Sequence, residues 1–256
     1  MLLLWMALAA WAGPDDAPLP DGAEPLAMDQ VMTRLGWEGE PVAAPFTSCR
    51  AAGVELMVIR GATVSAEHVS AERGAPLNLK QFIYELDVPV VVGGVVTYTA
   101  ALHLMRTGAA GVLVGFGGGA ASTSEKVLGV AAPMATAVSD VAAARRDYLD
   151  ESGGRYVHVI ADGGMGTSGD IVKAIAMGAD AVMLGSALAR AEEAPGKGWH
   201  WGQEAHHLEL PRGDRVNVGT VGPLEEVLFG PGHHTNGTSN LIGALRRSMA
   251  TTGYSD

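Results

Sequence analysis

The stretch Val159–Ser186, VIADGGMGTSGDIVKAIAMGADAVMLGS, decides the fold. It predicts a strand over Val157–Ala161, a glycine-rich turn, a helix over Gly169–Met177 and a second strand over Ala181–Leu184. A strand–helix–strand unit this short makes its two strands parallel neighbours. The turns that follow the two strands should therefore emerge side by side at one edge of a sheet.

Local signals in this stretch mark the helix ends and the two turns. Ser168 can cap the helix, and Gly178 ends it just beyond the last helical residue. The turns are Asp162-Gly-Gly and Gly185-Ser186. Ligands bind at the carboxyl edge of α/β sheets, and (β/α)8 barrels commonly hold phosphate in the loops after the last two strands. These turns are therefore candidate ligand contacts.

Composition supports the same class of fold. Of 256 residues, 48% are hydrophobic, only 5% are aromatic and 35 are glycine, which suits a repeat of strands and helices better than a β-sandwich. The net charge of -11 argues against duplex nucleic acid as a partner, although backbone N–H groups can still hold a nucleotide. The lone cysteine, Cys49, excludes an internal disulfide and a Cys-based metal cluster.

The amino-terminal region carries no strand–helix pattern. Met1–Ala12 is an apolar run that is too short to span a bilayer, and no Lys or Arg precedes it. We interpret it as a buried or accidental apolar start of a cytoplasmic protein, with a short secretory signal as the alternative. Residues 13–45 are rich in Pro, Gly, Asp and Glu, with one short helix expected at Asp29–Leu35. We therefore assign residues 1–48 to an irregular lead-in.

Five buried strands are expected after this lead-in. Three belong to a weak internal repeat over residues 52–59, 107–115 and 177–185, in which a helix-ending glycine and a short link precede a strand. Val88–Val92 and Val157–Ala161 supply the other two, and the spacing is typical of a parallel array. The helices between them are expected at Leu79–Leu86, Tyr98–Arg106, Ala135–Leu149 and Gly169–Met177.

The carboxyl-terminal part is expected to be less regular. A short helix is predicted over Ala187–Glu193, followed by a long flap over Pro195–Gly237 that contains a short helix at Leu224–Leu228. An amphipathic helix over Asn240–Thr251 should close the chain.

These segments resemble the IMP dehydrogenase/GMP reductase family. Val159–Ser186 is similar to its strand-7 to strand-8 signature, residues 115–138 to its catalytic-loop region, and residues 240–249 to its carboxyl-terminal helix. The nearest branch is the one called IMP dehydrogenase-related, known mainly from actinobacteria and cyanobacteria. That branch is also similar over residues 64–69, 77–82, 101–108, 193–196 and 210–213.

The resemblance implies an α/β fold of the (β/α)8 TIM-barrel family. Residues 49–256 would form a partial catalytic domain with strands 4 to 8 and a long flap after the last strand. The family's first three strands have no counterpart in the sequence, so we expect an incomplete barrel from a truncated chain or fragment. The family is homo-tetrameric, and an open sheet edge would favour aggregation.

The resemblance also implies an activity. The leading expectation is an oxidoreductase of purine (GMP) biosynthesis that converts IMP to XMP with NAD. One alternative is an NADPH-dependent GMP reductase, and another is a catalytically inactive protein that binds a purine nucleotide or has a regulatory role. A monovalent cation, potassium, is implied at Gly117 and Gly119 of the catalytic loop.

The resemblance places the nucleotide on the two turns. Asp162 would bind the ribose diol, because a carboxylate accepts both hydroxyl hydrogens. For the phosphate, glycine lets the backbone approach and a helix N-terminus favours an anion. The implied contacts besides Asp162 are Gly163, Gly164, Met183, Gly185 and Ser186. The alternative is that these glycines only make tight turns.

The catalytic position departs from the family. Ser122 stands where the family has its nucleophilic cysteine, and a hydroxyl is a poorer nucleophile than a readily ionised thiol. Thr123 beside it could donate a hydrogen bond, and Ala120 replaces the family's phosphate-binding serine. The alternative is a glycine-rich ligand loop without catalysis.

The cofactor side departs as well. By resemblance, Gly94 and Gly115 lie where NAD or NADP would bind, and Gly94 replaces an asparagine of the family. Arg212 is the nearest match to the flap arginine that activates water in dehydrogenases, with a solvated loop arginine as the alternative.

Other side chains suggest binding only weakly. The histidine pairs at 206–207 and 233–234 lack metal-binding spacing, so we interpret them as exposed loop residues. Trp199 and Trp201 could stack on adenine, but packing of the flap is the simpler interpretation.

Overall fold

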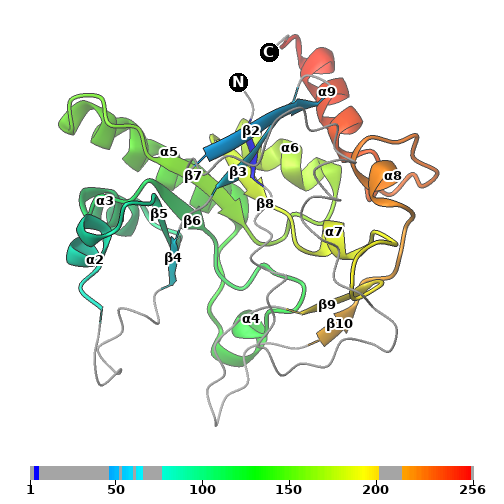
Figure 1. Ribbon diagram of the computed structural model, residues 1–256, viewed down its shortest axis with the longest axis horizontal. Helices are drawn as coiled ribbons and strands as arrows, with labels where there is room; N and C mark the ends of the chain where they lie inside the picture. Colours follow the sequence, from blue (N-terminus) through cyan, green and yellow to red (C-terminus); the bar gives the residue numbers. More distant parts are fainter. Residues whose placement is uncertain are drawn as a thin grey trace.

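A computed structural model describes residues 77–201 and 215–254, together with the backbone of four strands nearer the amino terminus (Figure 1). Those strands are β1 (Leu3–Trp5), β2 (Phe46–Ala51), β3 (Val54–Ile59) and β4 (Ala62–Ser65). The expected helix at Asp29–Leu35 and the flap residue Arg212 lie outside the described residues.

A five-stranded parallel sheet forms the centre of the described structure, in the order β4-β5-β6-β7-β8. The four strands that follow β4 confirm the prediction. They are β5 (Val90–Val95), β6 (Gly111–Val114), β7 (His158–Asp162) and β8 (Ala181–Met183). Among the described strands the parallel sheet stays open, so the barrel is incomplete, as expected.

The prediction that the strand within residues 52–59 belongs to the parallel array is wrong. Instead of joining the parallel sheet, β3 pairs antiparallel with β2 and parallel with β1 in a separate three-stranded sheet. Only two residues separate Ala51 from Val54, which is the length of a hairpin connection rather than of a link from a helix. The edge strand of the parallel sheet is β4, which the sequence pattern did not reveal.

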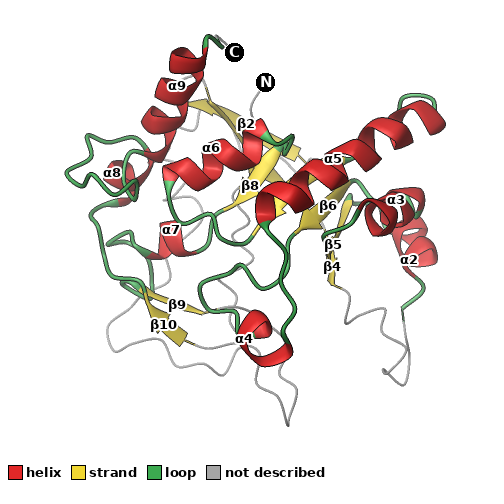
Figure 2. Cartoon of the chain, turned by 180° about the vertical axis from the view of Figure 1, so that it is seen from behind, coloured by secondary structure: helices red, strands yellow, loops and turns green. Residues whose placement is uncertain are grey.

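The expected helices between the strands are confirmed. They are α2 (Leu79–Glu85), α3 (Tyr98–Arg106), α5 (Met134–Glu151) and α6 (Ser168–Ala176). Figure 2 shows α5 and α6 in front of the sheet, where α3, α5 and α6 pack against its strands. Alternate strand residues face these helices or form a smaller cluster on the opposite face. That cluster contains Val91, Leu113, Ile160, Ala181 and Met183.

The amino-terminal cap of α6 differs by one residue from the prediction. Thr167, not Ser168, is the cap: its hydroxyl accepts from the Asp170 N–H at 3.4 Å, and the Asp170 carboxylate accepts from the Thr167 N–H at 3.2 Å. Gly178, with φ of +109°, ends the helix as predicted.

The region after β8 is more regular than expected. A short α7 (Ser186–Ala189) ends before the predicted Glu193, and the flap contains an antiparallel hairpin of β9 (Trp199–Trp201) and β10 (Arg215–Asn217). The expected α8 (Leu224–Leu228) and α9 (Leu241–Thr252) are confirmed.

One further helix, α4 (Ser124–Leu128), was not predicted. Figures 1 and 2 place α4 and the β9–β10 hairpin at the same end of the molecule, away from α9. In the described part of the chain, none of the helices combines the length and apolar character needed to cross a bilayer.

Candidate functional site

The carboxyl end of β5 and the loops after β6 and β7 contact one another through glycines. A Cβ atom on Gly94 would lie 2.4 Å from the Gly115 carbonyl oxygen, and one on Gly115 would lie 2.1 Å from the Asp162 carbonyl oxygen. Gly118 and Gly163 are also in tight contact, since a Cβ on Gly163 would lie 3.2 Å from the Gly118 Cα. Only glycine allows this close approach of the three segments.

Asp162 ends β7 beside Met183, the last residue of β8. Its carboxylate has no hydrogen bond or ion pair with a described residue, and burial raises its pKa from 3.8 to about 6. A desolvated acid without a protein partner at the carboxyl edge of a sheet is a candidate ligand contact, because active sites concentrate such groups. The structure thus brings Asp162, Gly163 and Gly164 together with Gly115 and Gly118.

The turn amides are the available anion donors at this edge. The N–H groups of Gly163, Gly164, Gly185 and Ser186 donate to no acceptor among the described residues. The N–H groups at the amino end of α6 already have acceptors. The Ser168 N–H donates to the Gly237 carbonyl at 2.8 Å, and the Thr167 N–H donates to the Asp170 carboxylate. The expected anion site at the start of this helix is therefore occupied by the protein's own acceptors.

Two residues near the turns were not predicted. Arg190, at the end of α7, donates from Nη1 to the Gly166 carbonyl at 2.7 Å and from Nε to the Val218 carbonyl at 3.4 Å. The His200 ring covers Gly185, since a Cβ there would lie 3.0 Å from His200 Cε1. Strand alternation in Trp-His-Trp is the only sequence signal that could have indicated this orientation of His200.

The catalytic-loop residues lie just before α4. Ser122 Oγ accepts from the Ser124 N–H at 3.3 Å, and the Ser122 N–H donates to the Gly119 carbonyl at 2.9 Å. No described Asp, Glu, His or Lys side chain forms a hydrogen bond with Ser122. Thr123 occupies the cap position of α4, although its side chain makes no capping bond.

The remaining predicted loop residues have local packing roles. Gly117 has φ of +72° and lies against the Val130 carbonyl, whereas Gly119 lies near Ser122. The cation at Gly117 and Gly119 stays a prediction. No group of three or more His, Cys, Asp or Glu side chains suited to a metal occurs among the described residues.

The flap tryptophans contact an arginine of the same hairpin. The Arg215 guanidinium carbon lies 5.4 Å from the Trp199 ring centre and 5.1 Å from that of Trp201. This arrangement supports the interpretation of the two rings as packing of the flap.

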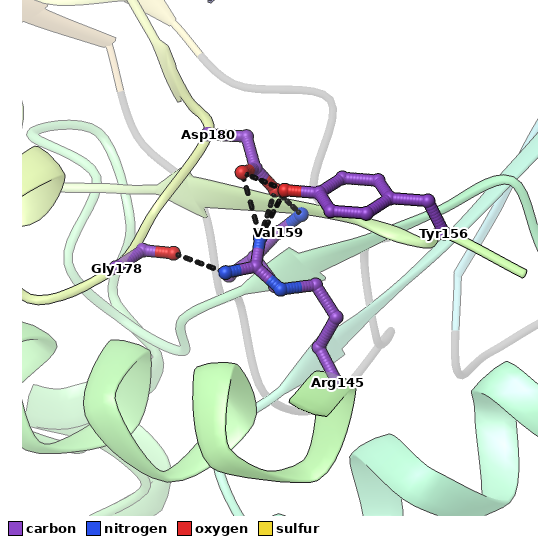
Figure 3. Close-up of polar contacts among 5 residues, drawn as sticks. All are labelled: Arg145, Tyr156, Val159, Gly178 and Asp180. Carbon is purple, nitrogen blue, oxygen red and sulfur yellow. Dashed lines mark hydrogen bonds and ion pairs between the residues drawn. The ribbon is translucent and has the colours of Figure 1, made fainter. Parts of the chain in front are cut away.

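A polar cluster at the opposite edge of the sheet serves the fold (Figure 3). Asp180, just before β8, accepts from Arg145 Nη1 at 2.5 Å, from the Tyr156 hydroxyl at 2.5 Å and from the Val159 N–H at 2.8 Å. Burial and the Asp180 hydrogen bond raise the pKa of Tyr156 to about 12. Because it joins α5 to the amino ends of β7 and β8, the cluster stabilises the sheet rather than forming part of the ligand edge.

Comparison with known proteins agrees with the geometry of the sheet and its loops. A family model described as IMP dehydrogenase / GMP reductase domain matches residues 45–208. A solved IMP dehydrogenase/GMP reductase-like protein from Corynebacterium glutamicum is 56% identical, with a TM-score of 0.66, and the match covers 78% of this chain and 52% of that one.

Two curated relatives are also similar to this chain over most of its length, and each match covers only part of the relative. An uncharacterized oxidoreductase of Mycolicibacterium smegmatis is 59% identical over 209 residues, which are 80% of this chain and 56% of the relative. An inosine-5'-monophosphate dehydrogenase of Methanocaldococcus jannaschii is 45% identical over 210 residues, covering 69% of this chain and 39% of that protein. The chain thus spans about half the length, or less, of the curated relatives it matches. By its sequence, its parallel sheet and these matches, the chain belongs to the IMP dehydrogenase/GMP reductase family.

Proposed function

We propose that the carboxyl edge of β7 and β8 binds a purine nucleoside monophosphate, and that the chain acts in the NAD-dependent oxidation of IMP to XMP. The observation that carries this proposal is the partly buried carboxylate of Asp162, which has no partner among the described residues and lies beside two turns with available N–H groups. Neither feature helps the free protein fold, because a desolvated charge and unpaired donors both cost free energy. A ligand with a diol and a phosphate would satisfy both.

In this proposal Asp162 accepts hydrogen bonds from the two ribose hydroxyls. With a pKa of about 6 it is mostly ionised at pH 7, so it can act as a double acceptor. The amides of Gly163, Gly164, Gly185 and Ser186 would donate to the phosphate, and Met183 would lie beside the purine by analogy with the family. With the ribose and the phosphate bound in this way, we expect the purine to face the loop that carries Ser122.

The redox step needs two groups besides the nucleotide. Oxidation at C2 of the purine requires a nucleophile and a hydride acceptor, for which the family suggests Ser122 and NAD. Gly94 and Gly115 pack against the backbone of the neighbouring strand end and loop, so packing alone explains these two glycines and the NAD contact there rests on the resemblance. Thr123 and Arg212 remain candidate participants by resemblance alone.

A second candidate function is nucleotide binding without turnover. Ser122 favours this function. Its Oγ accepts a hydrogen bond from the Ser124 N–H, and among the described residues no basic side chain forms a hydrogen bond with it that could activate the hydroxyl. GMP reduction with NADPH would need the same position as nucleophile and is the third possibility.

Calorimetric titration with IMP and GMP tests the binding proposal. Wild type should bind IMP, and Asp162→Asn should weaken binding by about 2–4 kcal/mol because it removes a charge-assisted pair of hydrogen bonds. Asp140→Asn, on the exposed face of α5, removes the same charge and should leave affinity unchanged. If neither nucleotide binds to wild type, the proposed function is wrong.

Absorbance of the reduced cofactor separates the three functions. NADH appearing with IMP and NAD identifies the dehydrogenase, and NADPH consumption with GMP identifies the reductase. Binding without either signal, together with turnover gained in Ser122→Cys, identifies a binding protein that has lost its nucleophile.

Cytoplasmic location, a homo-tetramer and a potassium ion complete the proposal by analogy with the family. Sedimentation of the purified chain tests the tetramer, since a monomer would contradict it. Titration of IMP in potassium and in sodium buffers tests the cation.

A further inference from the structure

Arg190 is a partly buried cation that has no acidic partner among the described residues. Its guanidinium lies half-buried between the turn after β7 and the end of the flap hairpin, where it donates to the carbonyls of Gly166 and Val218. Burial lowers its pKa, and no carboxylate among the described residues pairs with it. The other partly buried arginine with a described role, Arg145, is neutralised by Asp180 at 2.5 Å.

Partial burial makes the Arg190 charge less favourable in the free protein than it would be in water. Desolvating a charge costs several kcal/mol unless an opposite charge compensates it, and carbonyl groups compensate it only in part. The chain has 28 acidic residues against 17 basic ones, so acids are abundant. Within residues 77–201 and 215–254 no acid neutralises Arg190, which leaves its guanidinium available to an anionic ligand.

The surroundings of Arg190 coincide with the two candidate turns. A Cβ on Gly166 would lie 3.9 Å from Arg190 Nη1 and 3.8 Å from Ser186 Oγ, so guanidinium and hydroxyl converge on the same glycine. A guanidinium has five N–H donors, and the hydrogen bonds to Gly166 and Val218 use only two of them.

His200 lies on the same side. On β9 it alternates with Trp199 and Trp201, which both face Arg215, and its ring covers Gly185. Burial and the nearby Arg190 charge lower the pKa of His200. A lowered pKa keeps His200 neutral near pH 7. The local positive potential at this edge of an acidic protein therefore comes from Arg190.

We propose that Arg190 binds the phosphate group of the ligand and selects phosphomonoesters over unphosphorylated nucleosides. The inference rests on the proposed nucleotide site and adds the charged residue that the turns lack. Arginine suits this role because its planar donor fork matches phosphate oxygens.

Calorimetry with IMP, inosine and ribose 5-phosphate tests the proposal on the full chain. Arg190→Gln should lower the affinity for IMP and for ribose 5-phosphate at least about tenfold, since a guanidinium–phosphate contact is charge-assisted. The affinity for inosine should stay unchanged. The difference between wild type and Arg190→Gln should shrink when salt is raised, because salt screens charge pairs. Arg190→Lys should recover part of the affinity for both phosphorylated probes.

Arg146→Gln is the matched control, because it removes the same charge from an exposed position on α5. Thermal unfolding of each variant shows whether Arg190→Gln remains folded. If Arg190→Gln does not fold, the affinities of Arg190→Lys for the same probes test the proposal.

The outcomes separate this inference from the proposed function. Unchanged IMP affinity in Arg190→Gln, or an equal loss for inosine, overturns the role of Arg190 and leaves the nucleotide site standing. Arg190-dependent binding of ribose 5-phosphate without binding of IMP or GMP supports the inference and overturns the proposed function. If wild type binds none of the probes, both are wrong.

Discussion

Replacing Asp162 with asparagine should stabilise the free protein at neutral pH while it removes the ribose contact. Burial raises the carboxyl pKa from 3.8 to about 6, so the folded state disfavours the charged form. At about 1.36 kcal/mol per pKa unit, this corresponds to roughly 3 kcal/mol of stability lost above pH 6. Asparagine has no charge to desolvate and should avoid that loss.

The pH dependence gives the sign of the effect. Below pH 3.8 both states hold the proton and the carboxyl carries no penalty. As pH rises, the unfolded state ionises first, so stability falls until the folded carboxyl also ionises near pH 6. The advantage of Asp162→Asn over wild type should therefore be about 3 kcal/mol at pH 8 and about half of that at pH 5.

Urea unfolding followed by tryptophan fluorescence between pH 5 and 8 measures this difference. Asp140→Asn, an exposed position on α5, should show no comparable pH-dependent gain. A less stable Asp162→Asn at pH 8, or a difference that does not change with pH, would refute burial as the cause and would mean that the protein itself holds the carboxylate.

Three further changes, two of them with a matched control, test the fold by the same urea assay. Asp180→Ala should cost about 3 kcal/mol because it leaves the Arg145 charge buried and unpaired, whereas Arg106→Ala should change little because its pair with Glu151 is exposed. Gly115→Ala should cost about 3 kcal/mol or more, since its Cβ would meet the Asp162 carbonyl; Gly153→Ala, with open space around it, should cost only about 1–2 kcal/mol. Thr167→Ala should cost about 1 kcal/mol by removing the α6 cap, and an unchanged midpoint in any destabilising variant would contradict its assigned contact.

Periodic segments were predictable because their signals are local. Helices α3 and α6 and strands β7 and β8 agree with the expected ranges to within one or two residues, since apolar spacing and ending glycines act over a few residues. The assignment of β3 to the parallel array failed, because the same glycine–strand pattern also follows a hairpin.

The candidate site was predictable only in part. Asp162 and the glycine turns stand out in the sequence because they follow two strands of one short parallel unit. Arg190 and His200 do not stand out in the sequence. An arginine after a short helix and a histidine between two tryptophans match no motif for ligand binding. Their approach to Gly166 and Gly185 depends on where the flap folds back.

The sequence by itself determined the parallel strand–helix order, the turns at its carboxyl edge and the resemblance to the family, because backbone periodicity and glycine placement are encoded over short distances. The tertiary structure alone decided which charges are desolvated and which have partners. Within the part of the chain that the structure describes, Asp162 has no donor and Arg190 has no acid, and the amino end of α6 is used internally. These outcomes depend on contacts between residues far apart in the chain, and on water excluded by packing, which no local pattern records.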